Sequence, residues 1–261
     1  MILNIAGFNI DFGFENTDFV QGFEAKNQDT PVIKITHKKE LSECYGIQFT
    51  DAPAEHILKR KESRSEILCA NGSWSECTVY GQNCSDVEYS LPLSAICSKF
   101  ALLNTIFVHA SFVEYKGSGI IFAGHSGVGK TTQARLWANF LDAAPINGDK
   151  VFLRVVDNEV FACGSPWKGS SEYCVNKNVP LKAIVILNQA KENEISVLNS
   201  IECMKYFMPH VFFPHWDENC KVKAIDTFND ILEKVPVFLL KCRPDEEAVL
   251  LTKEAVFNKK N

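Results

Sequence analysis

The chain has 261 residues, of which 46% are hydrophobic and 23% charged, a balance typical of a globular protein. Its length allows one large domain or two small ones. The net charge of −5 argues against a general nucleic-acid binder, because neutralising a phosphate backbone requires a basic surface.

Other features of the sequence indicate a cytoplasmic protein that does not contact membranes. No stretch reaches the roughly 18 apolar residues of a membrane span, and the start "MILNIAGFNIDFGF" lacks the basic and apolar segments of a secretory signal. The ten cysteines form no C-x-x-C pair. We therefore expect reduced, mostly buried thiols in a reducing compartment.

The N-terminal third, residues 1–92, has the pattern of short strands separated by turns. Strands are predicted at residues 31–37, 46–49 and 75–81, where apolar and β-branched residues gather. The segments between them, such as "NQDTP" and "CANGS", are typical of turns. We expect an antiparallel, β-rich N-terminal region.

The middle of the chain predicts a helix followed by a hairpin. Apolar residues at helical spacing indicate a helix over 93–107. A strand is expected at 111–115, a turn at "KGSG", and a buried strand at 119–124. The helix that follows covers 130–141 and has four apolar side chains to bury.

The remaining sequence alternates strands with helices. Two strands around the "DNE" turn are expected within 151–164, and buried strands at 180–189 and 235–242. Helices are predicted at 201–208, 223–234 and 245–255. Together these elements predict a mixed α/β fold, with a nucleotide-binding kinase domain over residues 93–261.

One motif in this region carries specific chemistry: "GHSGVGKT" matches G-x-x-x-x-G-K-[ST] throughout. In this pattern glycines let backbone N–H groups face phosphate oxygens, and the next helix adds its positive N-terminus. We expect the Lys130 ammonium to reach the β- and γ-phosphates of ATP and the Thr131 hydroxyl to hold Mg²⁺. The predicted nucleotide-binding residues are Gly124, His125, Ser126, Gly127, Val128, Gly129, Lys130, Thr131 and Thr132.

Phosphoryl transfer also needs an acid from a neighbouring strand. Asp149 in "APINGDKVFL" is the best candidate for the metal and the acceptor, because a glycine beside an acid permits close approach; a plain turn residue is the alternative. His109 is a second candidate, since a histidine can handle protons. A lone histidine among apolar residues is more often a satisfied core residue.

These residues together resemble the C-terminal catalytic domain of the HPr kinase/phosphorylase family, a P-loop fold shared with phosphoenolpyruvate carboxykinases. That family has a histidine ahead of the hairpin that delivers "GxSGxGK[ST]", then a helix and an acidic doublet. Here His109 precedes Lys130 by 21 positions. The resemblance implies ATP at the loop, Mg²⁺ at Thr131 and Asp149, and catalysis by Asp149, His109 and Lys130. Gly148 replaces the first acid of the doublet, which puts phosphorolysis in doubt.

A second stretch, "CGSPWKGSSEYCVNKNVPLKAIVIL", resembles small HPr kinase-like proteins, some of which phosphorylate peptides. By this resemblance Trp167, Lys168 and Ser170 line the acceptor or phosphate site; a buried tryptophan on a turn is the alternative. The two histidines of "MPHVFFPHW", His210 and His215, lack a third ligand nearby, and we expect them to pack in the core.

The sequence thus favours an ATP- and Mg²⁺-dependent kinase acting on a hydroxyl of a small protein, a peptide or a small molecule, with a homo-oligomer implied by the resemblance. One alternative is a nucleotide-binding accessory protein without phosphotransfer, which Gly148 supports. A carboxykinase is a weaker alternative, because no second metal cluster is found and the chain is about half as long as that family's.

Overall fold

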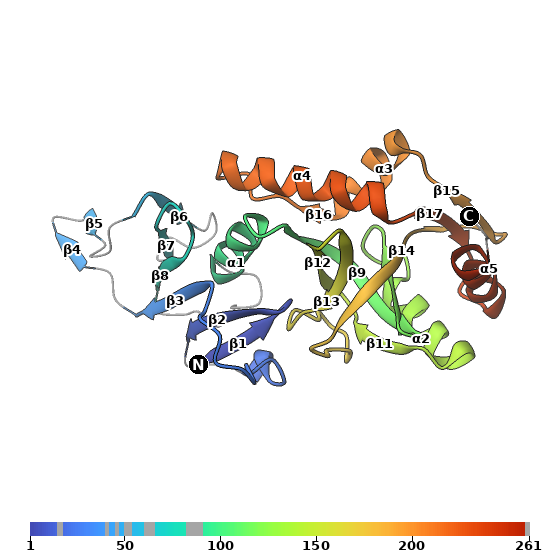
Figure 1. Cartoon of the computed structure of the whole chain (residues 1–261), viewed down its shortest axis with the longest axis horizontal. Coiled ribbons are helices and arrows are strands. Elements are labelled where there is room, and N and C mark those ends of the chain that lie inside the picture. The colour runs from blue at the N-terminus through green and yellow to red at the C-terminus, as the bar shows by residue number, and fades with distance from the viewer. Residues whose placement is uncertain are drawn as a thin grey trace. The chain divides into compact units, whose positions relative to one another are not determined.

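A computed structural model describes residues 1–14, 18–39, 42–44, 47–49, 54–59, 66–81 and 91–258 (Figure 1). The chain divides into two compact units, Met1–Leu103 with Phe213–Ala224, and Asn104–Phe212 with Ile225–Asn261. The first unit therefore extends past the predicted boundary between residues 92 and 93 and includes a later segment of the chain. The assignment of kinase chemistry to residues 93–261 stays a prediction.

The first unit is built on a six-stranded sheet in the order β1-β2-β3-β8-β7-β6, which confirms the β-rich N-terminal region. The expectation of a purely antiparallel sheet was wrong, because β3 pairs in parallel with both β2 and β8. Long connections on each side of β3 permit this pairing, whereas a tight turn would not. The strands are β1 (Ile2–Ile5), β2 (Phe8–Gly13), β3 (Ile33–Lys38), β6 (His56–Lys59), β7 (Ile67–Ala70) and β8 (Glu76–Tyr80).

The strands predicted at 31–37 and 75–81 correspond to β3 and β8. The strand predicted at 46–49 corresponds to β5 (Ile47–Phe49), which pairs with β4 (Ser42–Cys44), while residue 46 lies outside the described residues. A short turn, η1 (Asp18–Val20), lies between β2 and β3. Strands β1, β2, β6 and β7 were not predicted.

A buried aspartate attaches the later segment, residues 213–224, to the first unit. Asp217 is 8% exposed and accepts a hydrogen bond of 2.8 Å from Trp74 Nε1. His56 Nε2 lies 3.2 Å from the same carboxylate and its ring stacks on Trp74. Asp217 also accepts from the backbone N–H of Cys220, in the first turn of helix α4 (Glu218–Lys234).

The second unit contains a nine-stranded sheet. Its main path is β10-β9-β12-β13-β14-β17-β15, and β10 also pairs with β14, so that five strands form a closed ring. Strands β10, β14 and β17 run parallel to one another. The strands are β9 (Thr105–Tyr115), β10 (Ser118–Ala123), β11 (Ala144–Asn147), β12 (Lys150–Val156), β13 (Glu159–Gly164), β14 (Asn178–Gln189), β15 (Glu194–Val197), β16 (Val211–Phe212) and β17 (Val237–Cys242).

The prediction of a helix over residues 93–107 was wrong for its second half. Helix α1 (Leu91–Ala101) ends at Ala101, and strand β9 begins at Thr105 after a turn in which Asn104 has φ +50°. Strand β9 is buried on both faces, so its apolar run lacks the alternation that marks a strand in sequence. Its β-branched and aromatic residues favour the extended form.

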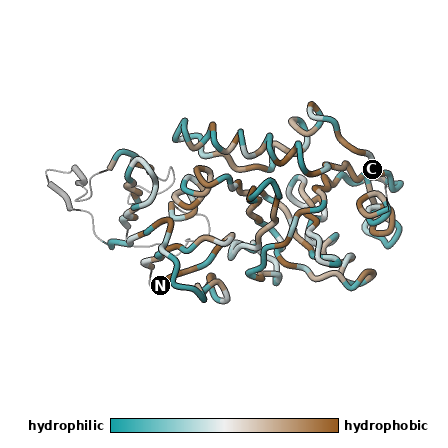
Figure 2. Tube along the Cα trace, viewed as in Figure 1, coloured by the Kyte–Doolittle hydropathy of each residue, from teal (hydrophilic) through white to brown (hydrophobic). Residues whose placement is uncertain are grey.

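The other predicted elements of this unit are confirmed within a few residues. The predicted helices correspond to α2 (Lys130–Leu141), α3 (Ser200–Tyr206), α4 and α5 (Glu246–Phe257). The predicted strands correspond to β10, the β12–β13 hairpin, β14 and β17. Strands β11, β15 and β16 were not predicted. Along α4 hydrophilic and hydrophobic residues alternate, as expected of an amphipathic helix (Figure 2).

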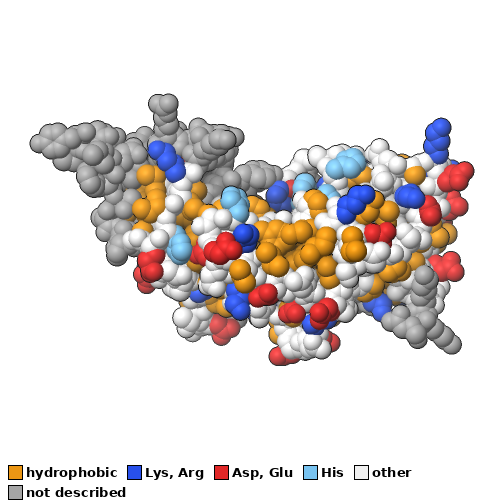
Figure 3. All heavy atoms as spheres, turned by 90° about the horizontal axis from the view of Figure 1, so that it is seen from above, with side chains coloured by type: hydrophobic (Ala, Val, Ile, Leu, Met, Phe, Trp, Pro, Cys, Tyr) orange, Lys and Arg blue, Asp and Glu red, His pale blue; other side chains and the backbone are white. Residues whose placement is uncertain are grey.

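Within the described part of the chain, no helix is long and apolar enough to cross a membrane. Acidic and basic side chains are interspersed on the face shown in Figure 3. The expected burial of the thiols is confirmed at seven described cysteines, whereas Cys174 is half-buried. None of these eight cysteines forms a disulfide. The buried ones are Cys69, Cys77, Cys97, Cys163, Cys203, Cys220 and Cys242.

Helix α2 is fixed to the sheet by Trp137, whose side chain is completely buried. Its ring centroid lies 5.8 Å from that of Tyr115 on β9 and 5.9 Å from that of Phe122 on β10. These contacts join the helix to the hairpin that leads into it. The position of the helix N-terminus therefore depends on this packing.

Replacing Trp137 with Ala is expected to lower the free energy of unfolding by about 3–5 kcal/mol, because it leaves a large cavity. Trp137→Phe should cost less than about 2 kcal/mol, since it keeps a ring and removes an indole N–H that has no acceptor among the described residues. Urea unfolding followed by circular dichroism measures both. Equal losses in the two variants would contradict this account of the packing.

Candidate active site

The glycine-rich segment 124–129 joins β10 to α2 in a conformation that requires glycine at two of its positions. Gly124 has φ +152°, and a Cβ there would lie 2.9 Å from Val128 Cγ1. Gly129, at φ +112°, directly precedes α2 and has no side chain with which to cap it. The first N–H groups of the helix therefore remain available to an anion, and the helix dipole favours negative charge there.

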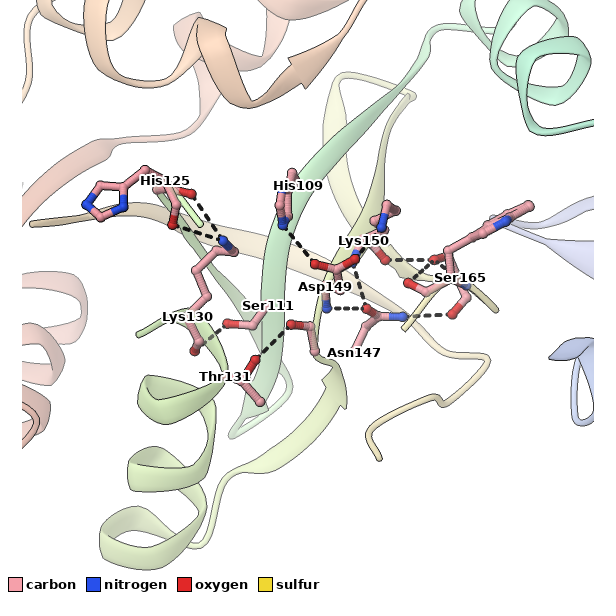
Figure 4. Close-up of polar contacts among 12 residues, drawn as sticks. His109, Ser111, His125, Lys130, Thr131, Asn147, Asp149, Lys150 and Ser165 are labelled. Carbon is pink, nitrogen blue, oxygen red and sulfur yellow. Dashed lines mark hydrogen bonds and ion pairs between the residues drawn. The ribbon is translucent and has the colours of Figure 1, made fainter. Parts of the chain in front are cut away.

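Lys130 lies at the start of α2 and is 7% exposed. Its Nζ donates to the carbonyl oxygens of Gly124 and His125 at 3.1 and 3.3 Å, and its own carbonyl accepts a 2.8 Å bond from Ser111 Oγ (Figure 4). Burial lowers the pKa of the ammonium, and the charge of Asp149 partly offsets this effect. The lysine is thus held inside the curve of the loop.

His109 and Asp149 form a direct contact, with Nε2 of the histidine 2.8 Å from Oδ1 of the aspartate. Lys150 binds the other carboxylate oxygen through its Nζ. His109 is opposite Lys150 in the pairing of β9 with β12, which brings the three side chains together (Figure 4). The His109 side chain is 43% exposed, so the alternative interpretation, a histidine packed in the core, is wrong.

The pKa of Asp149 is set by opposing effects. Burial raises it, but the hydrogen bonds and positive charges of His109 and Lys150 outweigh burial and lower the pKa to about 2. The carboxylate is therefore ionised at every pH near neutrality. A carboxylate held on one side by an imidazole and on the other by an ammonium group is also strongly oriented.

Asn147 fixes the backbone that presents Asp149. It is fully buried, and its Oδ1 accepts hydrogen bonds of 2.9 Å from the backbone N–H groups of Asp149 and Lys150. Its Nδ2 donates to the carbonyl of Ser165 at 2.7 Å. One amide thus connects the end of β11, the turn at Asp149 and the segment after β13.

Thr131 reaches the same turn from the other side, because its hydroxyl donates to the carbonyl of Gly148 at 3.1 Å. The Thr131 hydroxyl and the Asp149 carboxylate are oxygen donors of the kind that Mg²⁺ prefers. A carboxylate offers about four lone-pair positions, so two partners leave Asp149 with capacity for a metal. The donor set therefore fits this ion.

The glycine that replaces an acid in the resembled family is enforced by its surroundings. A Cβ at Gly148 would collide with the side chain of Ser171. Gly169 has φ +57°, and a Cβ there would lie 2.9 Å from Asp149 Cγ. The segment 165–171 consequently lies directly against Asp149, where two glycines permit the close approach.

The three residues predicted to line an acceptor site have different surroundings. Trp167 is 2% exposed and packs edge-on against Phe107 and Phe152, with centroids 5.9 and 6.1 Å away. This favours the alternative reading of a buried tryptophan on a turn. Lys168 is half-buried and Ser170 exposed, on either side of the glycine that contacts Asp149. Their role as acceptor contacts stays a prediction.

Most of the predicted residues surround one hollow of about 270 Å³. Its lining includes the three predicted catalytic side chains and most of the predicted loop. Val128 is buried beneath the loop, and His125 is exposed, with Nδ1 2.8 Å from the carbonyl oxygen of Ser126. The residues that line the hollow are His109, Ser126, Gly127, Gly129, Lys130, Thr131, Thr132, Gly148 and Asp149.

Sequence reasoning missed three neighbours of this hollow. Lys150 and Asn147 gain their contacts only through the register of β12 and the fold of the turn, for which the sequence has no signal. His210, in the short turn η3 (Met208–His210), is half-buried; burial, followed by the charges of Lys130, His109 and His125, lowers its pKa. The prediction that both histidines pack in the core is thus only partly right for His210, which is half-buried. It is wrong for His215, which is exposed.

Comparisons with known proteins complete the description. No curated protein matches the chain. Among solved structures, the chain is similar to the Hpr(Ser) kinase/phosphatase from Coxiella burnetii, with 11% sequence identity and a TM-score of 0.35 over 58% of this chain and 94% of that one. A likeness this distant does not assign a function. The family model described as SynChlorMet cassette protein ScmC matches residues 77–244, more than half of the chain, and the protein therefore belongs to the ScmC family.

Proposed function

We propose that this protein is an ATP- and Mg²⁺-dependent phosphotransferase that moves the γ-phosphate to a hydroxyl group. The observation that carries the proposal is the convergence of His109, Asp149, Lys130 and Thr131 on one hollow at the start of α2. An anion-binding helix terminus, a buried lysine and an oriented carboxylate are the parts that phosphoryl transfer requires.

The glycine-rich loop would bind the phosphates of ATP. Its glycines and the uncapped start of α2 direct N–H groups at anionic oxygens, and Lys130 would exchange its contacts with Gly124 and His125 for the β- and γ-phosphates. Thr131 and Asp149 would hold Mg²⁺, which would neutralise charge on the phosphate oxygens. Binding at the loop places the terminal phosphate beside the His109–Asp149 pair.

The acceptor hydroxyl would approach from the side of His109 and Asp149. Its oxygen forms a bond to the γ-phosphorus as the bond to the β,γ-bridging oxygen breaks, and its proton passes to the pair. A carboxylate with a pKa of about 2 is a weak base. The transition state of phosphoryl transfer is loose, however, so orientation of the hydroxyl contributes more than early removal of its proton.

The exposed part of segment 165–171 supports an acceptor larger than water. Ser170 is exposed and Lys168 half-buried beside the glycine that contacts Asp149, so an incoming side chain would meet them first. We infer that the acceptor is a serine of a small protein or peptide, or the hydroxyl of a small molecule. The family description names a cassette, so peptides and proteins of that cassette are the first acceptors to test.

A second candidate function is nucleotide binding without transfer, as an accessory protein. It is favoured by Gly148, where a side chain would collide with Ser171, so that only one carboxylate is present at this turn. The two functions differ in one observable, since only a phosphotransferase produces a phosphorylated acceptor.

Lys130→Ala should abolish transfer and weaken ATP binding, because the phosphates lose their buried counter-charge. Transfer is followed by ³¹P NMR with Mg²⁺, ATP and a peptide and metabolite extract as the source of acceptors. Lys182→Ala, an exposed lysine on β14, is the matched control and should behave as wild type. Full activity of Lys130→Ala would exclude the proposed mechanism.

Asp149→Asn should leave ADP binding within about threefold of wild type when Mg²⁺ is omitted, and should lower the transfer rate by about 10²–10⁴-fold. The amide keeps the size of the side chain but removes the charge that orients His109. Asp142→Asn, at the exposed C-terminus of α2, is the control. An unchanged transfer rate would remove Asp149 from the chemistry.

The low pKa of Asp149 also predicts how stability depends on pH. The folded pKa of about 2 lies below the unfolded value of about 3.9. The carboxylate therefore stabilises the fold fully above about pH 4, and this contribution is lost as the pH falls toward 2. The stability difference between wild type and Asp149→Asn, measured by urea unfolding, should be constant from pH 8 to 5 and shrink below pH 4. A difference that shrinks already between pH 7 and 5 would contradict the low pKa.

A further inference from the structure

A second cavity, of about 370 Å³, lies on the other side of the glycine-rich loop, and we propose that it receives the base and ribose of the nucleotide. This inference rests on the proposed function, because it assumes that a nucleotide binds at the loop. It goes further by naming the residues that would distinguish a nucleotide from a simple polyphosphate. The volume lies in the range of about 300–1,000 Å³ that is usual for small-molecule sites.

The cavity shares a wall with the catalytic hollow. Gly127, Gly129 and Thr132 line both spaces, so a ligand whose phosphates rest on the loop can extend into either. The cavity also lies at the carboxyl ends of β14 and β17, which run parallel to β10. Strand β10 ends at the same edge and leads directly into the glycine-rich loop, so the loop and the cavity adjoin there. The remaining lining residues are Val128, Gln133, Leu187, Gln189, Ala190, Cys242, Arg243 and Pro244.

Arg243 lines the cavity, and three hydrogen bonds hold its guanidinium group in place. Its Nε donates to Asp245 at 2.8 Å, its Nη2 to Glu247 at 2.9 Å and its Nη1 to the carbonyl of Lys191 at 3.3 Å. These bonds use N–H groups in the plane of the guanidinium, so none of them engages its π faces. A guanidinium held in this way is suited to an aromatic base, through stacking and cation–π attraction.

Gln133 supplies a polar group that lacks a partner. It lies one turn into α2, is 3% exposed, and its Nε2 donates to Cys242 Sγ at 3.5 Å. Among the described residues no donor pairs with its Oε1. An unpaired buried acceptor is unfavourable, and an N–H of a base would pair with it after a small rotation of the carboxamide. The apolar residues Leu187 and Val128 line the same cavity.

The position of the cavity favours a nucleoside over the acceptor. Neither His109 nor Asp149 lines it, so a hydroxyl bound there would have no access to the catalytic pair. A nucleotide satisfies both spaces at once, because its base and its terminal phosphate are at opposite ends of one molecule. In this arrangement the cavity would determine the affinity for the nucleotide, and the hollow would contain the residues that act in phosphoryl transfer.

The experiment compares two ligands that differ only in the nucleoside, ADP and pyrophosphate, both with Mg²⁺, by isothermal titration calorimetry. Wild type should bind ADP at least about tenfold more tightly than pyrophosphate. Arg243→Ala should weaken ADP binding about fivefold and leave pyrophosphate binding unchanged. Arg135→Ala, an exposed arginine on α2, is the matched control and should change neither affinity.

Gln133→Met is a second variant, which keeps the inference testable if Arg243→Ala does not fold. It conserves volume and removes the unpaired acceptor, so the thermal midpoint should not fall, whereas ADP binding should weaken about fivefold relative to pyrophosphate. Equal loss of both ligands in either variant, or unchanged ADP binding in both, would overturn this inference and leave the proposed function standing. Failure of wild type to bind either ligand would overturn both.

Discussion

The pairing of strand β9 with its neighbours is the constraint on which the candidate site depends. Strand β9 pairs with β10, β11, β12 and β16, and is buried on both faces. It carries His109 and Ser111 two residues apart, hence on the same face. His109 contacts Asp149, and Ser111 binds the carbonyl of Lys130. One strand therefore positions the proposed catalytic pair relative to Lys130, and a shift of its register would separate them.

The surroundings of Asp149 leave room for one carboxylate at this turn and not for two. Ser171 fills the space in which a side chain at residue 148 would lie, and Gly169 approaches Asp149 from the same segment. Lys150 provides a positively charged partner, and His109 is the second side chain in contact with the carboxylate. The remaining acid is thereby oriented and fully ionised, which suits a role in charge placement and metal binding better than strong basicity.

The sequence predicted those parts of the site whose chemistry is local. The glycine-rich loop was predictable as a structure because its glycines permit a local backbone conformation with positive φ, and α2 follows from its own amphipathic pattern. Strand β9 was only half predicted, because a strand buried on both faces resembles a buried helix in sequence. Asn147, Lys150 and His210 were missed because their roles arise from contacts between segments far apart in the chain.

Two spaces flank the glycine-rich loop, and their linings differ in chemical character. The hollow with His109, Lys130 and Asp149 is lined by charged and hydroxyl groups, whereas the cavity with Arg243 is lined by apolar residues, two amides and one stacking surface. Only the loop, through Gly127, Gly129 and Thr132, belongs to both. If the proposed function holds, changes in the cavity would alter nucleotide binding without disturbing the His109–Asp149 contact, and changes in segment 165–171 would alter the acceptor without disturbing the nucleotide.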